Sequence, residues 1–309
     1  MILHTGLRTD IPAFYTEWFV NRLKEGFVMV RNPYNPIQVT KYSISPDVVD
    51  VLTFCTKNPA PFLPYLDLIR DYGKYWFVTI TPYGREIEPN VPEKEMVMES
   101  FRELSRAVGI NSVGWRYDPI FISEEYPVER HISDFEEMAS VLSGFTDTCI
   151  ISFIDLYKKV LRNFPEVRKV REDEKIRLVK EFVRIGKRFG INIKACAEGT
   201  EWEAYGVDCG GCMTVSTFER AIDCTLNVPK GKGARPECGC LLGCDIGAYN
   251  TCAHLCRYCY ANYDAKTVME NMGKHNPKSP LLLGELTEHD VIHEAKQASW
   301  KDGQMRLIL

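Results

Sequence analysis

The sequence has few cysteines in its first two thirds, no long apolar run and no excess of positive charge. Only Cys55 and Cys149 precede residue 196, so the chain lacks the evenly spread cysteines of a disulfide-stapled scaffold. No stretch approaches the roughly 18 apolar residues of a spanning helix, and the first residues lack the basic and apolar segments of a secretion signal. The formal charge of −4 provides no general basic field for nucleic acid or a membrane surface. We therefore expect a cytoplasmic protein without a membrane partner, and a nucleic-acid partner that uses a local basic cleft remains open.

Short apolar runs rich in β-branched or aromatic residues alternate with helical patterns before residue 200. The predicted strands cover 27–31, 51–55, 76–80, 112–117, 148–153 and 192–196. The predicted helices cover 12–24, 60–71, 92–108, 133–143 and 173–189. This alternation is typical of an α/β fold with a parallel sheet, and the lack of a dinucleotide fingerprint favours a full or partial TIM-like β/α barrel.

The chain of 309 residues is long enough for one substantial core. We predict β/α barrel units over 1–200, followed over 201–309 by a cysteine-rich region and C-terminal helices that close the same domain. In that tail, His289 and His293 are spaced for one solvated helical face.

Charged side chains follow several predicted strands, at the end where a β/α barrel carries its chemistry. They are Lys57, Arg116, Asp118 and Glu198. Arg116 and Asp118 could bind a ligand or form an internal ion pair at the barrel mouth, and Lys57 has the same two interpretations. Asp10 precedes the first predicted helix and is expected to be its N-cap.

Ten of the twelve cysteines lie between Cys196 and Cys259, which predicts a local metal-binding region. The segment TCAHLCRYCY places Cys252, Cys256 and Cys259 at spacings of four and three residues. Three cysteines in one loop can ligate three irons of a [4Fe–4S] cube and leave the fourth iron open. Structural zinc is the main alternative, although zinc prefers C-x-x-C pairs that provide four ligands.

This loop resembles the C-x-x-x-C-x-aromatic-C signature of radical S-adenosylmethionine (SAM) enzymes, with Tyr258 at the aromatic position. The resemblance implies a [4Fe–4S] cluster that binds SAM and cleaves it reductively, so that a 5′-deoxyadenosyl radical abstracts hydrogen from a substrate. It also implies an electron donor such as ferredoxin or flavodoxin. Most members carry the loop near the N-terminus, whereas here it follows the βα units, so we expect a permuted barrel. Within this resemblance, Arg116 and Asp118 become candidates for the carboxylate and ribose of SAM, Glu198 for its amino group, and Lys57 for a further cofactor contact.

Longer segments are similar to the family catalogued as domain of unknown function 1848, and this resemblance covers nearly the whole chain. The segments are LRTDIPAFYTEWFVNRL (7–23), FCTKNPAPF (54–62), WRYDPI (115–120), ISFIDLY (151–157), ECGC (237–240), DIGAYNTCAHLCRYCYANY (245–263) and SPLLLGEL (279–286). TKNP and RYDP also resemble, faintly, spore photoproduct lyase, a radical SAM DNA-repair enzyme.

Seven further cysteines lie in the cysteine-rich region, enough for a second metal site. Cys196 ends a predicted strand at the barrel mouth, and ECGC belongs to the family resemblance. We therefore predict an auxiliary [4Fe–4S] cluster on Cys196, Cys212, Cys238 and Cys240. The alternative is a zinc knot on Cys209, Cys212, Cys238 and Cys240. Cys224 and Cys244 are expected to be bystanders.

Two other functional classes compete with an enzyme. An iron–sulfur electron-transfer protein would not need about 195 residues of βα scaffold before its clusters. A zinc-stabilised nucleic-acid-binding protein would use the basic run PKGKGARPE at 229–237.

Overall fold

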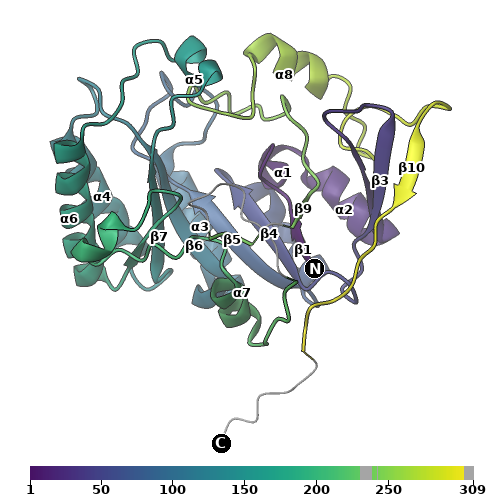
Figure 1. Ribbon diagram of the computed structural model, residues 1–309, viewed down its shortest axis with the longest axis horizontal. Helices are drawn as coiled ribbons and strands as arrows, with labels where there is room; N and C mark the ends of the chain where they lie inside the picture. The colour runs from purple at the N-terminus through teal and green to yellow at the C-terminus, as the bar shows by residue number, and fades with distance from the viewer. Residues whose placement is uncertain (230–238, 242, 303–309) are drawn as a thin grey trace, which may run out of the picture.

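The computed structural model describes residues 1–229, 239–241 and 243–302, and its main element is a seven-stranded parallel sheet (Figure 1). The strands lie in the order β8-β7-β6-β5-β4-β1-β9. Their bounds are β1 (Ile2–His4), β4 (Val51–Thr56), β5 (Gly73–Thr79), β6 (Val113–Ile120), β7 (Thr148–Phe153), β8 (Asn192–Ala195) and β9 (Cys244–Asp245). From β1 through β4 to β8, the strands follow one another across the sheet in chain order, and β9 is added beside β1.

The helices agree with the predicted pattern in most places. They are α1 (Ile11–Phe14), α2 (Thr16–Glu25), α3 (Lys94–Val108), α4 (Val128–Leu142), α5 (Lys158–Asn163), α6 (Glu172–Phe189), α7 (Val215–Ile222) and α8 (Ala265–Met272), with 3-10 segments η1 (Ala60–Ile69), η2 (Ile110–Ser112) and η3 (Glu201–Tyr205). In α6, Leu178 and Phe182 share one buried face, and Gly190 ends the helix in the left-handed region with φ 70°. The predicted helix over 12–24 is broken at Tyr15 into α1 and α2. The segment predicted as a helix over 60–71 is 3-10 instead, and it contains Pro64, which cannot donate a helical hydrogen bond.

The two faces of the main sheet bury different partners, because side chains alternate along each strand. On one face, Trp76 belongs to the larger core, which includes residues of α2, α3, α4 and α6. On the other face, Tyr75 and Phe77 pack in a smaller cluster with Phe218 of α7 and with Cys240. The cysteine-rich segment therefore covers the face opposite the main helices, which is the face that a closed barrel would enclose.

The predicted α/β class with a parallel sheet is confirmed, but a closed barrel is not formed by the described residues. The strands β8 and β9 lie at the two edges of the sheet and do not pair with each other. The strand predicted over 27–31 exists as β2 (Phe27–Arg31), yet it lies outside the main sheet. It pairs antiparallel with β3 (Gln38–Ser43) in a three-stranded sheet whose third strand is β10 (Val291–Glu294). The first strand of the main sheet is β1, which was not predicted. It has only three residues, too few to show a strand pattern in the sequence.

Between residues 262 and 302, the described part of the tail, α8 is the only helix. His293, which we expected on a helical face with His289, lies in the exposed strand β10 and pairs with Thr40 of β3. The helical prediction for these two histidines is wrong, because pairing with β3 outweighs the local spacing. Among the helices in the described ranges, none combines the length and apolarity needed to cross a bilayer.

Candidate metal centres

Loops that follow β1 and β4 meet the three-cysteine loop (251–259) at the carboxyl edge of the main sheet. Asp10 follows β1 and accepts hydrogen bonds from the backbone N of Ala13 at 3.1 Å and of Lys57 at 2.8 Å. The first contact caps α1 as predicted, and the second joins the loop after β4. His254 Nε2 lies 2.9 Å from the same carboxylate. Because parallel strands end at one edge of a sheet, these contacts place the three-cysteine loop on the edge where α/β folds bind ligands.

A buried ion pair holds Tyr258, the aromatic residue of the signature. The hydroxyl of Tyr258 donates to Glu88, whose Oε1 lies 2.9 Å from Lys57 Nζ and 2.6 Å from the hydroxyl of Thr81. The side chains of Lys57 and Glu88 are only 12% and 4% exposed. Lys57 Nζ also lies 5.6 Å from the centroid of the Tyr258 ring, within cation–π range. Lys57 therefore contacts the three-cysteine loop through Glu88 and Tyr258.

The thiols of the three-cysteine loop are close enough to interact electrostatically. Burial raises the pKa of the Cys252 thiol, and the neighbouring Asp10, Cys259 and Cys256 raise it further. Their sulfur atoms nevertheless do not all lie within 4.8 Å of one another. An iron–sulfur cube does not need its ligands closer together, because each cysteine of a cube binds a different iron. The raised pKa favours the neutral thiol when no metal is bound. A bound metal would favour the thiolate instead, because its cysteine ligands are deprotonated. The residues therefore fit the cluster that the signature implies.

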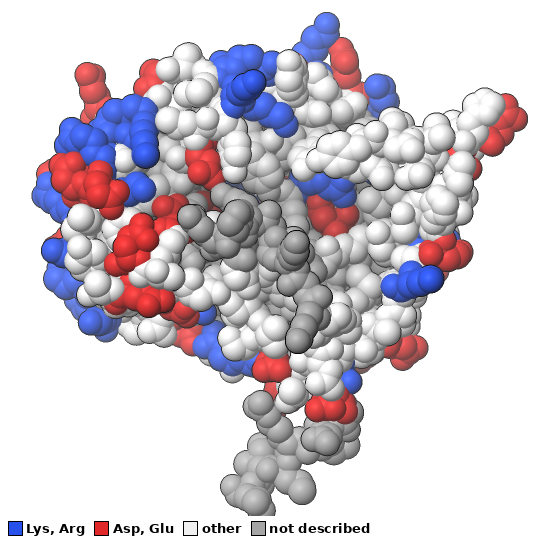
Figure 2. Space-filling model, in the orientation of Figure 1, with Lys and Arg blue, Asp and Glu red and all other residues white. Residues whose placement is uncertain are grey.

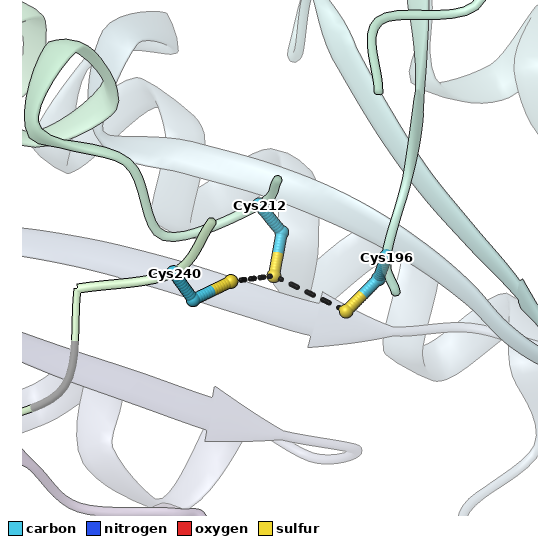
Figure 3. A group of neighbouring side chains, drawn as sticks. All are labelled: Cys196, Cys212 and Cys240. Carbon is cyan, nitrogen blue, oxygen red and sulfur yellow. Dashed lines mark hydrogen bonds between the residues drawn. The ribbon is translucent and has the colours of Figure 1, made fainter. Parts of the chain in front are cut away.

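Three cysteines predicted for a second site come together against the sheet face that carries Tyr75 and Phe77, which we call the second face (Figure 3). Cys212 Sγ lies 3.6 Å from Cys196 Sγ and 3.4 Å from Cys240 Sγ. All three sulfur atoms lie within 4.8 Å of one another, so this cysteine triad could hold a metal ion. Cys196 directly follows β8, Cys212 precedes α7 and Cys240 precedes β9. Cys238, the fourth predicted ligand, lies outside the described residues.

Gly239 allows the segments that carry the triad to approach each other. A Cβ atom at Gly239 would lie 2.5 Å from the carbonyl oxygen of Gly210, so the close contact requires glycine. The backbone N of Leu241 donates to Met213 O at 2.7 Å, and the backbone N of Met213 lies 3.4 Å from Cys240 Sγ. The loop before α7 and the segment before β9 are thus paired by backbone hydrogen bonds around the thiols.

The remaining cysteines of this region lie elsewhere. Cys209, a ligand in the zinc-knot alternative, is not part of the triad, and its Sγ lies 3.9 Å from Val207 O. Cys224 Sγ lies 3.5 Å from Thr225 O, and Cys244 lies in β9. Among the described residues, the structure therefore groups Cys212 and Cys240 with Cys196 rather than with Cys209.

Arg116, in the middle of β6, connects the triad with Asp118. Its Nη1 lies 3.8 Å from Cys212 Sγ, and its Nη2 lies 2.5 Å from Asp118 Oδ2. Ser152 donates from its hydroxyl to the other carboxylate oxygen of Asp118. Burial alone would lower the pKa of Arg116, but Asp118 and the thiols of Cys212 and Cys196 raise it well above its usual value. The internal ion pair that the sequence left open is therefore present, and its guanidinium also faces the triad.

Glu198 follows Cys196 by two residues, and its carboxylate is anchored by β7 and α6. Its Oε1 accepts a hydrogen bond from the backbone N of Phe153 at 2.7 Å, and its Oε2 lies 3.9 Å from Lys175 Nζ. Burial raises the pKa of Glu198 to about 7, although the bond from Phe153 and the charge of Lys175 oppose this.

A groove of about 840 Å³ opens beside the three-cysteine loop. Tyr260, which directly follows Cys259, lines it together with Tyr34 and Tyr157, and these tyrosines are 52%, 90% and 46% exposed. Lys159, at the start of α5, also lines the groove and donates from Nζ to Tyr260 O at 3.0 Å. Figure 2 shows Lys and Arg side chains gathered over α5 at the top of this face. The groove therefore combines exposed aromatic rings with positive charge next to the loop.

Two residues that hold the three-cysteine loop were missed from the sequence. Glu88 lies in an irregular segment after β5, where no spacing marks it. His254 lies inside the signature itself, between Cys252 and Cys256, and this position could have drawn attention to it.

Fold and site together define an α/β protein with an open parallel sheet and a cysteine triad that could hold a metal ion. The chain matches the family described as Domain of unknown function (DUF1848) over residues 2–261 and belongs to this family. The match includes the triad and the whole three-cysteine loop, and it confirms the family predicted from the sequence. None of the curated proteins matches this chain.

Proposed function

We propose that this protein is an enzyme of the radical SAM type, in which Cys252, Cys256 and Cys259 hold a [4Fe–4S] cluster. The observation that carries the proposal is a loop with three thiols docked on the carboxyl edge of a parallel sheet through Asp10 and Glu88. This is the edge where α/β sheets and barrels bind ligands. When bound, the cluster would supply the electron for reductive cleavage of SAM, and the resulting 5′-deoxyadenosyl radical would abstract hydrogen from the substrate.

The chain's own residues would position the loop and keep water out. Glu88 holds Tyr258 and Lys57, and Asp10 holds His254, so both anchors reach the loop from the strand-end side. The side chains of Glu88, Asp10 and His254 are almost fully buried, whereas those of Lys57 and Tyr258 are partly exposed. Rigid, dry surroundings of this kind favour reactive radical chemistry, because they prevent side reactions.

Two cations, Arg116 in β6 and Lys57 after β4, support a place for SAM. The guanidinium of Arg116 has five N–H donors, so it can bind a carboxylate while it remains paired with Asp118. Lys57 is a second cation at this edge, and Asp118 offers oxygen atoms to ribose hydroxyls. Glu198 is a weaker candidate for the amino group of SAM, because its carboxylate is already engaged by Phe153 and Lys175.

The groove supports an entry route for the substrate, because Tyr260 connects it directly to Cys259. An external reductant such as ferredoxin or flavodoxin would deliver the electron, and the reduced thiols of this chain suit the cytoplasm. The competing nucleic-acid-binding function rests on the basic run at 229–237, which lies almost entirely outside the described residues.

The cysteine triad supports an additional metal centre. The auxiliary [4Fe–4S] cluster predicted from the sequence would require the sulfur atoms to stand further apart than the 3.4 and 3.6 Å observed here.

The proposed function is tested by anaerobic reconstitution with iron and sulfide, followed by addition of SAM and dithionite. We expect a brown protein that forms 5′-deoxyadenosine. The C256A variant should form none, whereas the C209A variant should keep the activity, because Cys209 lies outside both cysteine groups. Colourless protein, or 5′-deoxyadenosine formation by C256A, would contradict the proposal.

A further inference from the structure

The cysteine triad differs from the three-cysteine loop in the spacing of its sulfur atoms. Ligands of a single tetrahedral ion with Zn–S bonds of about 2.3 Å stand about 3.8 Å apart. The distances of 3.6 Å from Cys212 to Cys196 and 3.4 Å from Cys212 to Cys240 are close to this value. The sulfur atoms of the triad all lie within 4.8 Å of one another, whereas those of the three-cysteine loop do not. The two cysteine groups of this chain thus differ in how closely their sulfur atoms lie.

We propose that Cys196, Cys212 and Cys240 bind one thiophilic divalent cation, of which Zn²⁺ is the type, instead of an auxiliary iron–sulfur cluster. This proposal does not depend on the SAM chemistry proposed above, because the two cysteine groups are separate.

The surroundings of the triad suit an anionic thiolate–metal centre. Three thiolates and one divalent cation sum to a single negative charge, and the guanidinium of Arg116 lies 3.8 Å from Cys212 Sγ. The backbone N of Met213, at 3.4 Å from Cys240 Sγ, is placed to donate to a thiolate. Cys212 and Cys240 are buried, which protects the site from solvent. Such outer contacts orient the ligands of a metal and stabilise their charge.

The ion would join three segments that are distant in the sequence. Cys196 follows β8, the outermost strand on one side of the main sheet, and Cys240 precedes β9, the outermost strand on the opposite side. Cys212 lies between them, before α7 on the second face. Binding of a metal ion at such a site contributes to folding, because the unfolded chain does not hold the ligands together. The role of the ion is therefore to hold the cysteine-rich segment on the face that a barrel would have enclosed.

The test measures zinc and iron in anaerobically purified protein from cells supplied with both metals. We expect one zinc per chain in the wild type and in C256A, and loss of that zinc in C212A. The matched control C209A should keep both metals, because Cys209 lies outside the triad. Iron should be lost in C256A and retained in C212A. Loss of iron and visible absorbance in C212A with zinc unchanged would overturn the proposal in favour of a cluster.

A second measurement does not rely on the folding of a cysteine variant. Zinc-edge X-ray absorption of the wild-type protein should show a shell dominated by sulfur at about 2.3 Å. A shell of nitrogen and oxygen only, or a wild-type protein without stoichiometric zinc, would overturn the proposal. A disulfide between Cys212 and Cys240 in the freshly purified protein would also overturn it, because the triad would then have too few thiolates. Failure of SAM cleavage alone would concern only the function proposed for the three-cysteine loop.

Discussion

Replacing Glu88 with Gln is expected to destabilise the protein strongly and to loosen the three-cysteine loop. The Glu88 carboxylate accepts hydrogen bonds from Lys57, Thr81 and Tyr258, and its side chain is only 4% exposed. Glutamine has nearly the same shape but no charge, so E88Q leaves the Lys57 ammonium buried without its counter-ion. Breaking a buried ion pair in this way costs about 3–5 kcal/mol of unfolding free energy.

The assay is a double-mutant cycle of apo protein in chemical denaturant with wild type, K57M, E88Q and K57M/E88Q. Because the double variant buries no unpaired charge, it should be more stable than E88Q alone. The coupling free energy should exceed the roughly 0.5 kcal/mol expected for independent sites. Hydrogen exchange of the amides in 251–259 should be faster in E88Q, since Tyr258 loses a charged acceptor.

The matched control for this cycle is E93Q. Glu93 forms an ion pair with Arg85 at 2.7 Å, but the two side chains are 61% and 74% exposed. Water screens such a pair, so E93Q should change stability by about 1 kcal/mol or less. Additive effects of K57M and E88Q, or equal losses in E88Q and E93Q, would refute the reasoning that burial makes the Lys57–Glu88 pair important.

Three further predictions concern pH, helix capping and the triad. Burial lowers the pKa of His131 from 6.5 to about 4, so the unfolded chain binds more protons in this window. Stability should therefore fall by up to about 3 kcal/mol as the pH drops from 6.5 to 4, and thermal unfolding of H131Q should show a smaller fall. An equal fall in both proteins would contradict this assignment. D264A removes a helix N-cap and should cost about 1 kcal/mol. D10A removes an N-cap together with the contacts to Lys57 N and His254, so it should cost more than D264A, and only D10A should reduce bound iron, because Asp10 holds the three-cysteine loop. Equal iron in both variants would argue against that link. G239A places a Cβ atom 2.5 Å from the carbonyl oxygen of Gly210, so it should reduce bound zinc and leave iron unchanged, as metal analysis of the purified variant would show. Undiminished zinc would mean that this close approach is not needed for metal binding.

Sequence patterns predict secondary structure correctly where burial follows from local periodicity. The apolar spacing of α6, with Leu178 and Phe182 on one face, predicts the helix correctly because its burial depends on local periodicity. The same reasoning fails for β10, where the spacing of His289 and His293 is helical. Pairing of Val291–Glu294 with Gln38–Lys41 decides that segment, and this partner lies about 250 residues away in the chain.

The α/β class, the family and the three-cysteine loop can be predicted from the amino-acid sequence alone, because these features depend on local alternation and on residues close together in the chain. The three-dimensional fold is needed to show that the sheet stays open and that Glu88 and Asp10 anchor the loop. It is also needed to show that Cys196 joins Cys212 and Cys240 while Cys209 does not. These contacts join residues that are far apart in the chain, so no sequence spacing predicts them. Their geometry depends on the order of the strands in the sheet and on how the loops pack over it.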